Sequence, residues 1–406
     1  AAEAQFRGAR AAIRVAHAGL YPTITGGASV TGSGTSGSLA STKSVGASQS
    51  SLITVPSVGA SWAPDLFGLV HRQIESATAT AQAVAGDLEN TRLLLESELA
   101  LDYFQMHGLD TEKQLLDSTI VAYRRALDLT LTRYNQGVAS QVDVAQARTQ
   151  LEQTRAQSTD TLVARQQFEH AIAILIGKAP SLLTIQPATM VTSLPAIPGL
   201  IPSELLERRP DIAANERRVA AANAQIGVTM AAYYPTVTLS ASGGLEGSSL
   251  LSLFTWPSRF WSLGPSISEL AFDAGRRRGI TEEAQAAYDQ TVANYRESVL
   301  TAFQGVEDQL ATLRVLEQES REQADAIHYA EQSLQLANAQ YQGGITTYLQ
   351  VITAQTFALQ NERTGVEINT RRWTASVSLI AALGGGWDSS QLPSAKDVTP
   401  VTKKTN

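Results

Sequence analysis

The residues that could do chemistry are few and scattered in this chain of 406 amino acids. Its histidines form no HExxH pair and stand apart from any acidic cluster, so each is expected to be solvated on a helix face rather than to bind a metal. They are His17, His71, His107, His170 and His328. Cysteine is absent, which excludes thiol catalysis and cysteine metal sites. We therefore predict no enzymatic activity, no cofactor and no metal.

Charge and hydropathy exclude further classes of protein. The chain carries 38 acidic and 31 basic residues, a net charge of −7, whereas a nucleic-acid binder would be basic. A Gly-x-Gly-x-x-Gly match at 32–37 lies in a Gly/Ser/Thr-rich loop with no helix after it, so it does not indicate a dinucleotide site. No stretch approaches the roughly 18 consecutive apolar residues of a membrane-spanning helix. The sequence starts without a signal-peptide pattern, so any export signal is expected to have been removed or to lie outside it.

One segment of the sequence occurs twice. Residues 133–147, RYNQGVASQVDVAQA, return at 340–354 as QYQGGITTYLQVITA. In each copy a Tyr-x-x-Gly step interrupts a long helical pattern, so a helix-turn-helix hairpin is expected to close there. The predicted turns carry Tyr134, Gly137 and Gly344.

The duplication predicts two structural repeats, at 1–179 and 210–387, joined by a proline-rich equatorial connector at 180–209. The tail at 388–406 is polar and is expected to be disordered. The first repeat is expected to contain the end of a helix, strands at 21–33 and 51–63, a long helix at 66–135 and a return helix at 140–176. The second is expected to contain a helix at 211–232, strands at 234–246 and 261–272, a long helix at 275–341 and a return helix at 347–383.

The long helix of the first repeat needs helical neighbours. Some 65 residues at about 1.5 Å each would reach roughly 100 Å. A heptad seam runs along it, and a 3.5-residue repeat of this length predicts a left-handed coiled coil. The seam includes Leu88, Leu95, Leu99, Met106, Leu109, Leu116, Ile120, Tyr123, Leu127 and Tyr134, with Asp102 and Thr130 among its interruptions.

The four strands decide the fold class. The helices leave no layer to cover them, and four strands are too few to close a useful barrel. An open sheet would expose its edges, which disappear if several protomers pool their strands. The strand ends carry the aromatic residues Tyr21, Trp62, Tyr233, Tyr234, Trp256 and Trp261. These aromatics fit the interface girdles of a transmembrane barrel, or equally the anchors of a soluble strand–helix junction.

Several motifs together resemble the TolC-like outer membrane efflux proteins. They are the Tyr-Pro before the first strand of each copy, the Tyr-x-x-Gly turns, LLERRPDIAANERRVAAANAQIG at 205–227 and ALGGGW at 382–387. The last two resemble the NodT-type (OprM-like) lipoprotein branch. The resemblance implies a homotrimer whose subunits give four strands each to a twelve-stranded outer-membrane barrel, which continues into a periplasmic α-barrel.

The same resemblance implies a function and a location. The protein would be the passive exit duct of a tripartite pump for drugs, toxic compounds or metal ions. Its partners would be a periplasmic adaptor, an inner-membrane transporter of the RND type, and the outer-membrane lipid of a Gram-negative-type bacterium. An acylated cysteine outside this sequence would anchor it to the membrane.

The resemblance also implies a gate at the periplasmic hairpin ends. Tyr341 and Asp143 stand where family members have a tyrosine and an aspartate that link neighbouring hairpins in the closed state, and Thr346 stands where some have an arginine. Leu349, Gln350, Thr353 and Thr356 occupy the constriction positions, where the absence of acids at Gln350 and Thr353 makes the tip nearly neutral. Alternatively, Tyr341 packs in the helix seam and Asp143 is a helix-start carboxylate.

A second hypothesis is a soluble coiled-coil scaffold that binds partners along its seams and has no pore. A duct should fractionate with outer membrane as a trimer, whereas a scaffold should purify from the aqueous phase.

Overall fold

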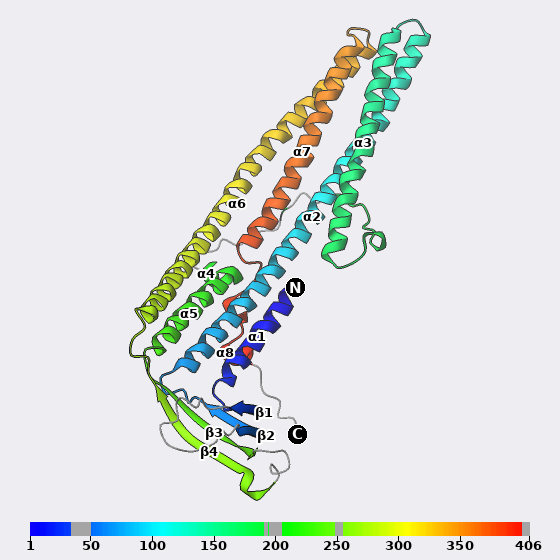
Figure 1. Cartoon of the computed structure of the whole chain (residues 1–406). Helices are drawn as coiled ribbons and strands as arrows, with labels where there is room; N and C mark the ends of the chain where they lie inside the picture. Colours follow the sequence, from blue (N-terminus) through cyan, green and yellow to red (C-terminus); the bar gives the residue numbers. More distant parts are fainter. Residues whose placement is uncertain (34–49, 191–193, 195–204, 248–254, 400–406) are drawn as a thin grey trace. The chain divides into compact units, whose positions relative to one another are not determined.

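A computed structural model describes residues 1–33, 50–190, 194, 205–247 and 255–399. The predicted connector and tail are therefore described in part, and the glycine motif at 32–37 falls largely outside the described residues. The element order is α1 (Ala2–Ala18), β1 (Thr23–Ser33), β2 (Ser50–Trp62), α2 (Leu69–Asn135), α3 (Gln141–Leu175), η1 (Pro180–Leu182), α4 (Leu205–Arg208), α5 (Pro210–Ala231), β3 (Thr236–Gly247), η3 (Trp256–Ser258), β4 (Arg259–Ser268), α6 (Arg276–Gln342), α7 (Tyr348–Ala382), η4 (Ser389–Gln391) and α8 (Ala395–Val398). The expected mostly helical fold with strands is confirmed (Figure 1).

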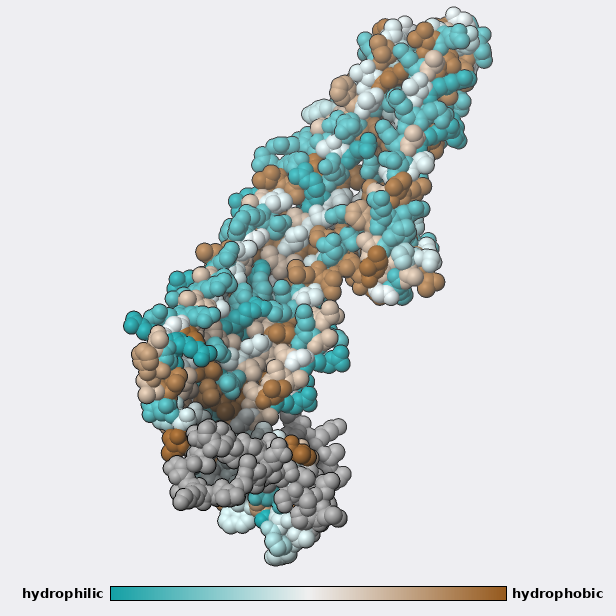
Figure 2. Space-filling view, in the orientation of Figure 1, coloured by the Kyte–Doolittle hydropathy of each residue, from teal (hydrophilic) through white to brown (hydrophobic). Residues whose placement is uncertain are grey.

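The chain folds into two compact units. The first comprises Ala1–Leu88, Asp211–Glu297 and Ser390–Asn406, and the second comprises Glu89–Pro210 and Ser298–Ser389. Each unit takes segments from both sequence copies, because the long helices α2 and α6 contribute to both. On the face shown in Figure 2, hydrophilic and apolar residues are intermixed. In the part of the chain that the structure describes, no helix is long and apolar enough to cross a membrane.

The first unit contains one antiparallel sheet with strand order β1-β2-β3-β4. Successive side chains of a strand point to opposite faces, so cross-strand partners share a face. One set of partners in β3 and β4 is apolar: Val237 with Ile267, Leu239 with Pro265, and Ala241 with Leu263. The alternate set is polar or small: Thr236 with Ser268, Thr238 with Ser266, Ser240 with Gly264, and Ser242 with Ser262. In β3 and β4 the sheet therefore has one apolar face and one face mainly of small hydroxyl side chains and glycine, with Phe260 opposite Gly244 at one end.

The apolar face has no cover among the described residues. Leu263 and Ile267 are 74% and 72% exposed, although both are large aliphatic side chains. On the polar face, the hydroxyls of Ser242 and Ser262 lie 2.8 Å apart across the strands. The outer strands β1 and β4 each pair on one side only. The sheet thus presents unsatisfied edges and an exposed apolar face together.

The C-terminal tail is not wholly disordered, so that expectation was wrong for its first part. Ser394 and Asp397 form a capping box that starts α8, a single turn that ends at Val398. The Val398 side chain is fully buried in a cluster with Ile13 and Ala81. Arg10 Nε donates to the Val398 carbonyl oxygen at 3.1 Å. Hydropathy patterns did not indicate this ordered turn, because a single buried valine in a polar stretch forms no pattern.

In the second unit, α2 continues unbroken through Gly108. A Cβ on Gly108 would lie 2.5 Å from Thr370 Oγ1, so the glycine lets α7 approach α2 closely. The heptad seam is buried at Met106 and Leu116, yet Leu95 is exposed. Helical neighbours therefore cover only part of the predicted seam.

Buried charges hold the connector against α2 and α3. Arg165 donates to Asp110 Oδ1 and to Glu169 Oε2, at 2.7 Å each, and to the Ile185 carbonyl oxygen at 2.6 Å. Glu169 accepts from the backbone N–H of Ile185. His107 Nδ1 lies 3.0 Å from Asp110 Oδ2. The expectation that every histidine is solvated was wrong for His107, which is buried because the connector folds over it.

Two motifs that carried the family resemblance contact each other in the second unit. The glycines of ALGGGW, Gly384 to Gly386, all have positive φ. A Cβ on Gly384 would lie 1.9 Å from the carbonyl oxygen of Arg208, in LLERRPD. Arg209 Nη1 donates to the Ala382 carbonyl oxygen at 2.8 Å. The close approach of the two backbones requires glycine at 384.

We predict that Gly384→Ala lowers the free energy of unfolding by about 3 kcal/mol, because the new Cβ forces the backbones apart and the φ of +94° is strained. Gly386→Ala is the matched control, since its φ is also positive but its Cβ would meet no atom within 4 Å. It should cost about 1–2 kcal/mol. Denaturant unfolding followed by far-ultraviolet circular dichroism measures both, and equal losses would contradict the close-contact argument.

Candidate functional site

The two hairpin turns share one backbone geometry. Gly137 and Gly344 have φ of +75° and +74°, a conformation that glycine adopts without strain. The Gly137 N–H donates to the Tyr134 carbonyl oxygen at 2.9 Å, and the Gly344 N–H donates to that of Tyr341 at 3.0 Å. The turns form where the repeated Tyr-x-x-Gly step predicted them.

The side chains of the two turns differ. Tyr134 is 42% exposed, whereas Tyr341 is 6% exposed. Tyr341 belongs to a buried cluster with Ala147, Tyr348 and Val351, and the rings of Tyr341 and Tyr348 lie 5.2 Å apart. Ala147 comes from α3 and the others from α6 and α7. This cluster therefore joins the two hairpins near their tips.

Arg133 contacts Tyr341 from the other hairpin. Its guanidinium lies over the Tyr341 ring, 4.7 Å from the centroid. Its Nη1 donates to the Gln342 carbonyl oxygen at 3.1 Å, at the C-terminal end of α6. The Arg133 Nε and the Tyr341 hydroxyl are both buried without a hydrogen-bond partner among the described residues. Sequence reasoning did not select Arg133, although its place beside the repeated tyrosine was a usable signal.

Asp143 starts α3 in a capping box. Its Oδ2 accepts from the Ser140 N–H at 2.9 Å, and its own N–H donates to Ser140 Oγ at 3.2 Å. At the equivalent start of α7, Thr347 makes no side-chain capping bond. There the Thr346 hydroxyl donates to Gln350 Oε1. The first return helix is therefore capped by a charged side chain, whereas the second has no side-chain cap.

The predicted constriction residues lie on one exposed face of α7. Leu349, Thr353 and Thr356 recur at helical spacing, and Gln350 is exposed beside them. The Thr353 and Thr356 hydroxyls donate to carbonyl oxygens of their own helix, at 2.9 Å each. Gln350 and Thr353 also line a groove of about 660 Å³ between α6 and α7. This face carries no charge, as the sequence predicted.

Burial controls the ionisation of Tyr348. The pKa of the Tyr348 phenol is raised to about 12, chiefly by burial, with smaller contributions from the nearby Tyr341, Tyr123 and Asp143. A hydrogen bond with Thr130 opposes these effects in part. The phenol therefore stays neutral at physiological pH, and the cluster holds the hairpins together without a titrating group.

The six predicted interface aromatics lie at the ends of the strands. Tyr21, Trp62, Tyr233 and Tyr234 lie where strands meet helices, and Trp256 and Trp261 lie at the other end of β4. All are exposed to some degree. Trp62 Nε1 donates to the Leu20 carbonyl oxygen at 3.0 Å, and the Tyr234 and Phe67 rings stack with their centroids 4.9 Å apart. The guanidinium carbon of Arg277 lies 5.4 Å from the Tyr233 ring centroid, and that of Arg259 lies 3.6 Å from the Trp256 ring centroid.

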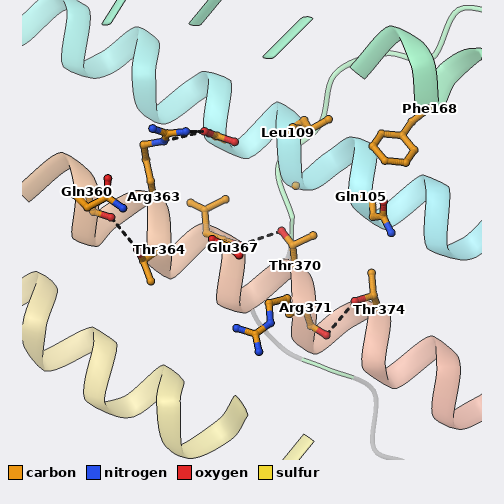
Figure 3. A pocket seen from close by; sticks show the side chains of 13 residues that line it. Gln105, Leu109, Phe168, Gln360, Arg363, Thr364, Glu367, Thr370, Arg371 and Thr374 are labelled. Carbon is orange, nitrogen blue, oxygen red and sulfur yellow. Dashed lines mark hydrogen bonds and ion pairs between the residues drawn. The ribbon is translucent and has the colours of Figure 1, made fainter. Parts of the chain in front are cut away.

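A second groove, of about 430 Å³, lies between α2 and α7 (Figure 3). Arg363 crosses from α7 to Glu112 on α2, with Nε donating to Oε1 at 2.8 Å, and Phe168 of α3 lines the groove. Among the residues that line this groove, no nucleophilic side chain is paired with a general base. Among the described residues, no group of three or more histidines and carboxylates could hold a metal. The groove therefore offers no catalytic arrangement.

Comparisons with known proteins agree with this geometry. The family model described as outer membrane efflux protein matches residues 1–178 and 201–385. Outer membrane protein OprJ of Pseudomonas aeruginosa is 33% identical over 326 residues, 80% of this chain and 68% of OprJ. Toluene efflux pump outer membrane protein TtgF of Pseudomonas putida is 34% identical over 329 residues, again 80% of this chain and 68% of TtgF. A solved structure of the outer-membrane channel OprN superposes with a TM-score of 0.87 at 29% identity, covering 95% of this chain and 86% of that one. These similarities confirm the predicted TolC-like fold, and the twelve-stranded barrel stays a prediction.

The raised pKa of Tyr348 predicts a response to alkali. Since folding favours the neutral phenol, its contribution to stability is complete below the unfolded pKa of about 10 and is lost as pH rises through about 12. The tyrosinate absorbance of the wild type should show a late step that Tyr348→Phe lacks. A difference between the two titrations centred at or below about pH 10 would contradict the burial argument.

Proposed function

This chain belongs to the outer membrane efflux protein family, and from that premise we propose how it forms the exit duct of a tripartite efflux pump. It is a channel of the outer membrane of Gram-negative bacteria that extends into the periplasm, and it is not an enzyme. The alternative of a coiled-coil scaffold without a pore is wrong, because the relatives of this chain are efflux components of the outer membrane.

The observation that carries the proposal is the exposed apolar face of the sheet. Leu263 and Ile267 lie bare on a face that in a soluble protein would be covered. In a transmembrane barrel, strands alternate apolar side chains toward lipid with polar ones toward the lumen. The unpaired edges β1 and β4 are antiparallel to each other, so β4 of one copy could continue onto β1 of the next. Three copies would close twelve strands into one barrel, as the homotrimer requires.

The exposed aromatics support the same placement. Tyr21, Tyr233 and Tyr234 lie at one end of the strands and Trp256 and Trp261 at the other, as the two girdles of a barrel do. We propose that the first group marks the periplasmic interface of the outer-membrane lipid and the second group the external interface. Anchoring through an acylated cysteine outside this sequence stays a prediction.

Cargo and partners follow from the relatives. TtgF is named for toluene efflux and other relatives for solvent and antibiotic efflux, so we propose toxic organic compounds as cargo, with metal ions less favoured. A barrel lumen lined by serine and threonine would select little by charge. Selection would then fall to an inner-membrane transporter, of the RND type, reached through a periplasmic adaptor.

We propose that the gate lies at the hairpin tips. We propose that the Tyr341 hydroxyl bonds the Asp143 carboxylate of an adjacent hairpin in the closed trimer. Two observations support this: the hydroxyl has no hydrogen-bond partner among the described residues of its own chain, and Ser140 holds Asp143 at the helix start. Because the hydroxyl is buried within the single chain, the hairpin tip would have to rearrange for an adjacent hairpin to reach it. Thr346 and Gln350 are neutral and bond to each other, so neither would add a charged link to the proposed tyrosine–aspartate bond.

Charged substitutions on the two faces of β4 test the barrel. Leu263→Lys should lower the free energy of unfolding from phospholipid vesicles by roughly 2–4 kcal/mol, because the ammonium would face lipid. Ser262→Lys, the adjacent control, should cost less than half as much because it would face water. Urea titration of the folded trimer, followed by gel mobility, measures both. Equal costs, or a larger cost for Ser262→Lys, would reject the assigned faces.

Removing either partner of the gate should open it. The wild-type protein in planar bilayers should conduct weakly at rest, and Tyr341→Phe or Asp143→Ala should raise the resting conductance. The hydrogen bond from a phenol to a carboxylate should contribute about 1.5–3 kcal/mol to closure. Conductance unchanged in both variants would remove the tyrosine–aspartate bond from the mechanism and leave the duct in place.

A further inference from the structure

We propose that Arg133 is a positioning residue that holds the second hairpin closed against the first, independently of the Tyr341 hydroxyl. This inference rests on the proposed duct with its gate at the hairpin tips. It assigns a gating role to a residue outside the constriction and outside the tyrosine–aspartate bond.

The contacts of Arg133 cross from one sequence repeat to the other. Arg133 belongs to the last turn of α2, whereas Tyr341 and Gln342 end α6. The guanidinium lies 4.7 Å from the Tyr341 ring centroid, within the range of a cation–π interaction. The same side chain donates to the Gln342 carbonyl oxygen, where the α6 dipole is negative and attracts a cation. One arginine therefore engages both a side chain and a helix end of the other hairpin.

Burial strengthens this contact. Tyr341 is nearly inaccessible, and Arg133 Nε has no access to water. A cation–π pair is stronger where water is excluded, since water no longer competes for the charge. The Arg133 contact uses the face of the Tyr341 ring, so it does not need the phenol hydroxyl.

The second copy of the repeat has no equivalent of this contact. Gln340 occupies the position in the second copy that Arg133 has in the first, and Tyr134 is the counterpart of Tyr341. A neutral glutamine cannot make a cation–π interaction with Tyr134, and Tyr134 is exposed. The contact of Arg133 with Tyr341 and Gln342, here called the clamp, therefore acts on the hairpin formed by α6 and α7 and has no counterpart on the other hairpin.

The test is the resting conductance of the full-length trimer in planar bilayers. Arg133→Gln should raise the conductance roughly three- to tenfold by removing the cation from the Tyr341 ring. Arg133→Lys, which keeps the charge and can reach the ring, should restore most of the closure. Arg125→Gln is the matched control, because this exposed arginine lies two turns earlier on the same helix and its loss changes the net charge equally. It should conduct like the wild type.

The Tyr341→Phe background separates this clamp from the tyrosine–aspartate bond. Phenylalanine keeps the ring, so Arg133→Gln should raise the conductance by the same factor there as in the wild type. The proposal is overturned if Arg133→Gln conducts like the wild type, if Arg125→Gln opens the channel equally, or if the effect vanishes in Tyr341→Phe. Conductance absent from the wild type and every variant would instead reject the duct itself, and this inference with it.

Discussion

The structure depends on the unmet hydrogen-bonding capacity of a four-stranded sheet. A strand edge carries unpaired N–H and C=O groups, and exposing an aliphatic face to water costs free energy. A soluble protein would cover both, but the sheet here keeps Leu263 and Ile267 bare while its other face is serine, threonine and glycine. In the proposed trimer, identical neighbours would pair the edges and lipid would cover the apolar face. The long helices can then remain polar on their surfaces, because they do not have to supply the missing layer.

At the hairpin tips, the two copies of the duplicated sequence share one backbone turn but make different side-chain contacts. Both turns keep the same left-handed glycine, since the backbone reversal requires it. The side chains around them diverge: Asp143 caps one return helix with a charge, whereas its counterpart Gln350 accepts from a neutral threonine. Tyr341 is buried and Tyr134 is exposed. A shared backbone thus supports one hairpin anchored by its own caps and another that depends on contacts from outside.

Much of this fold could be predicted because its signals are local or periodic. The repeat gave both turns, hydropathy alternation gave the strands, and the resemblance gave the family. What could not be predicted depends on contacts between residues far apart in sequence. His107 looked like a surface histidine until the connector covered it, and Val398 looked like part of a polar tail. Arg133 was visible beside a repeated tyrosine, but the tyrosine it contacts belongs to the other copy.

The glycine run at 384–386 has a consequence for how the chain matures. These residues come late in synthesis, yet they pack directly on the Arg208 backbone and on Leu93, which emerge much earlier. A polypeptide released before Gly384 would leave those earlier surfaces uncovered, and the second unit would stay open to chaperones and proteases of the periplasm. The contacts that close the second unit over Arg208 and Leu93 therefore form only after residue 385 is made, although the surfaces they cover are present long before.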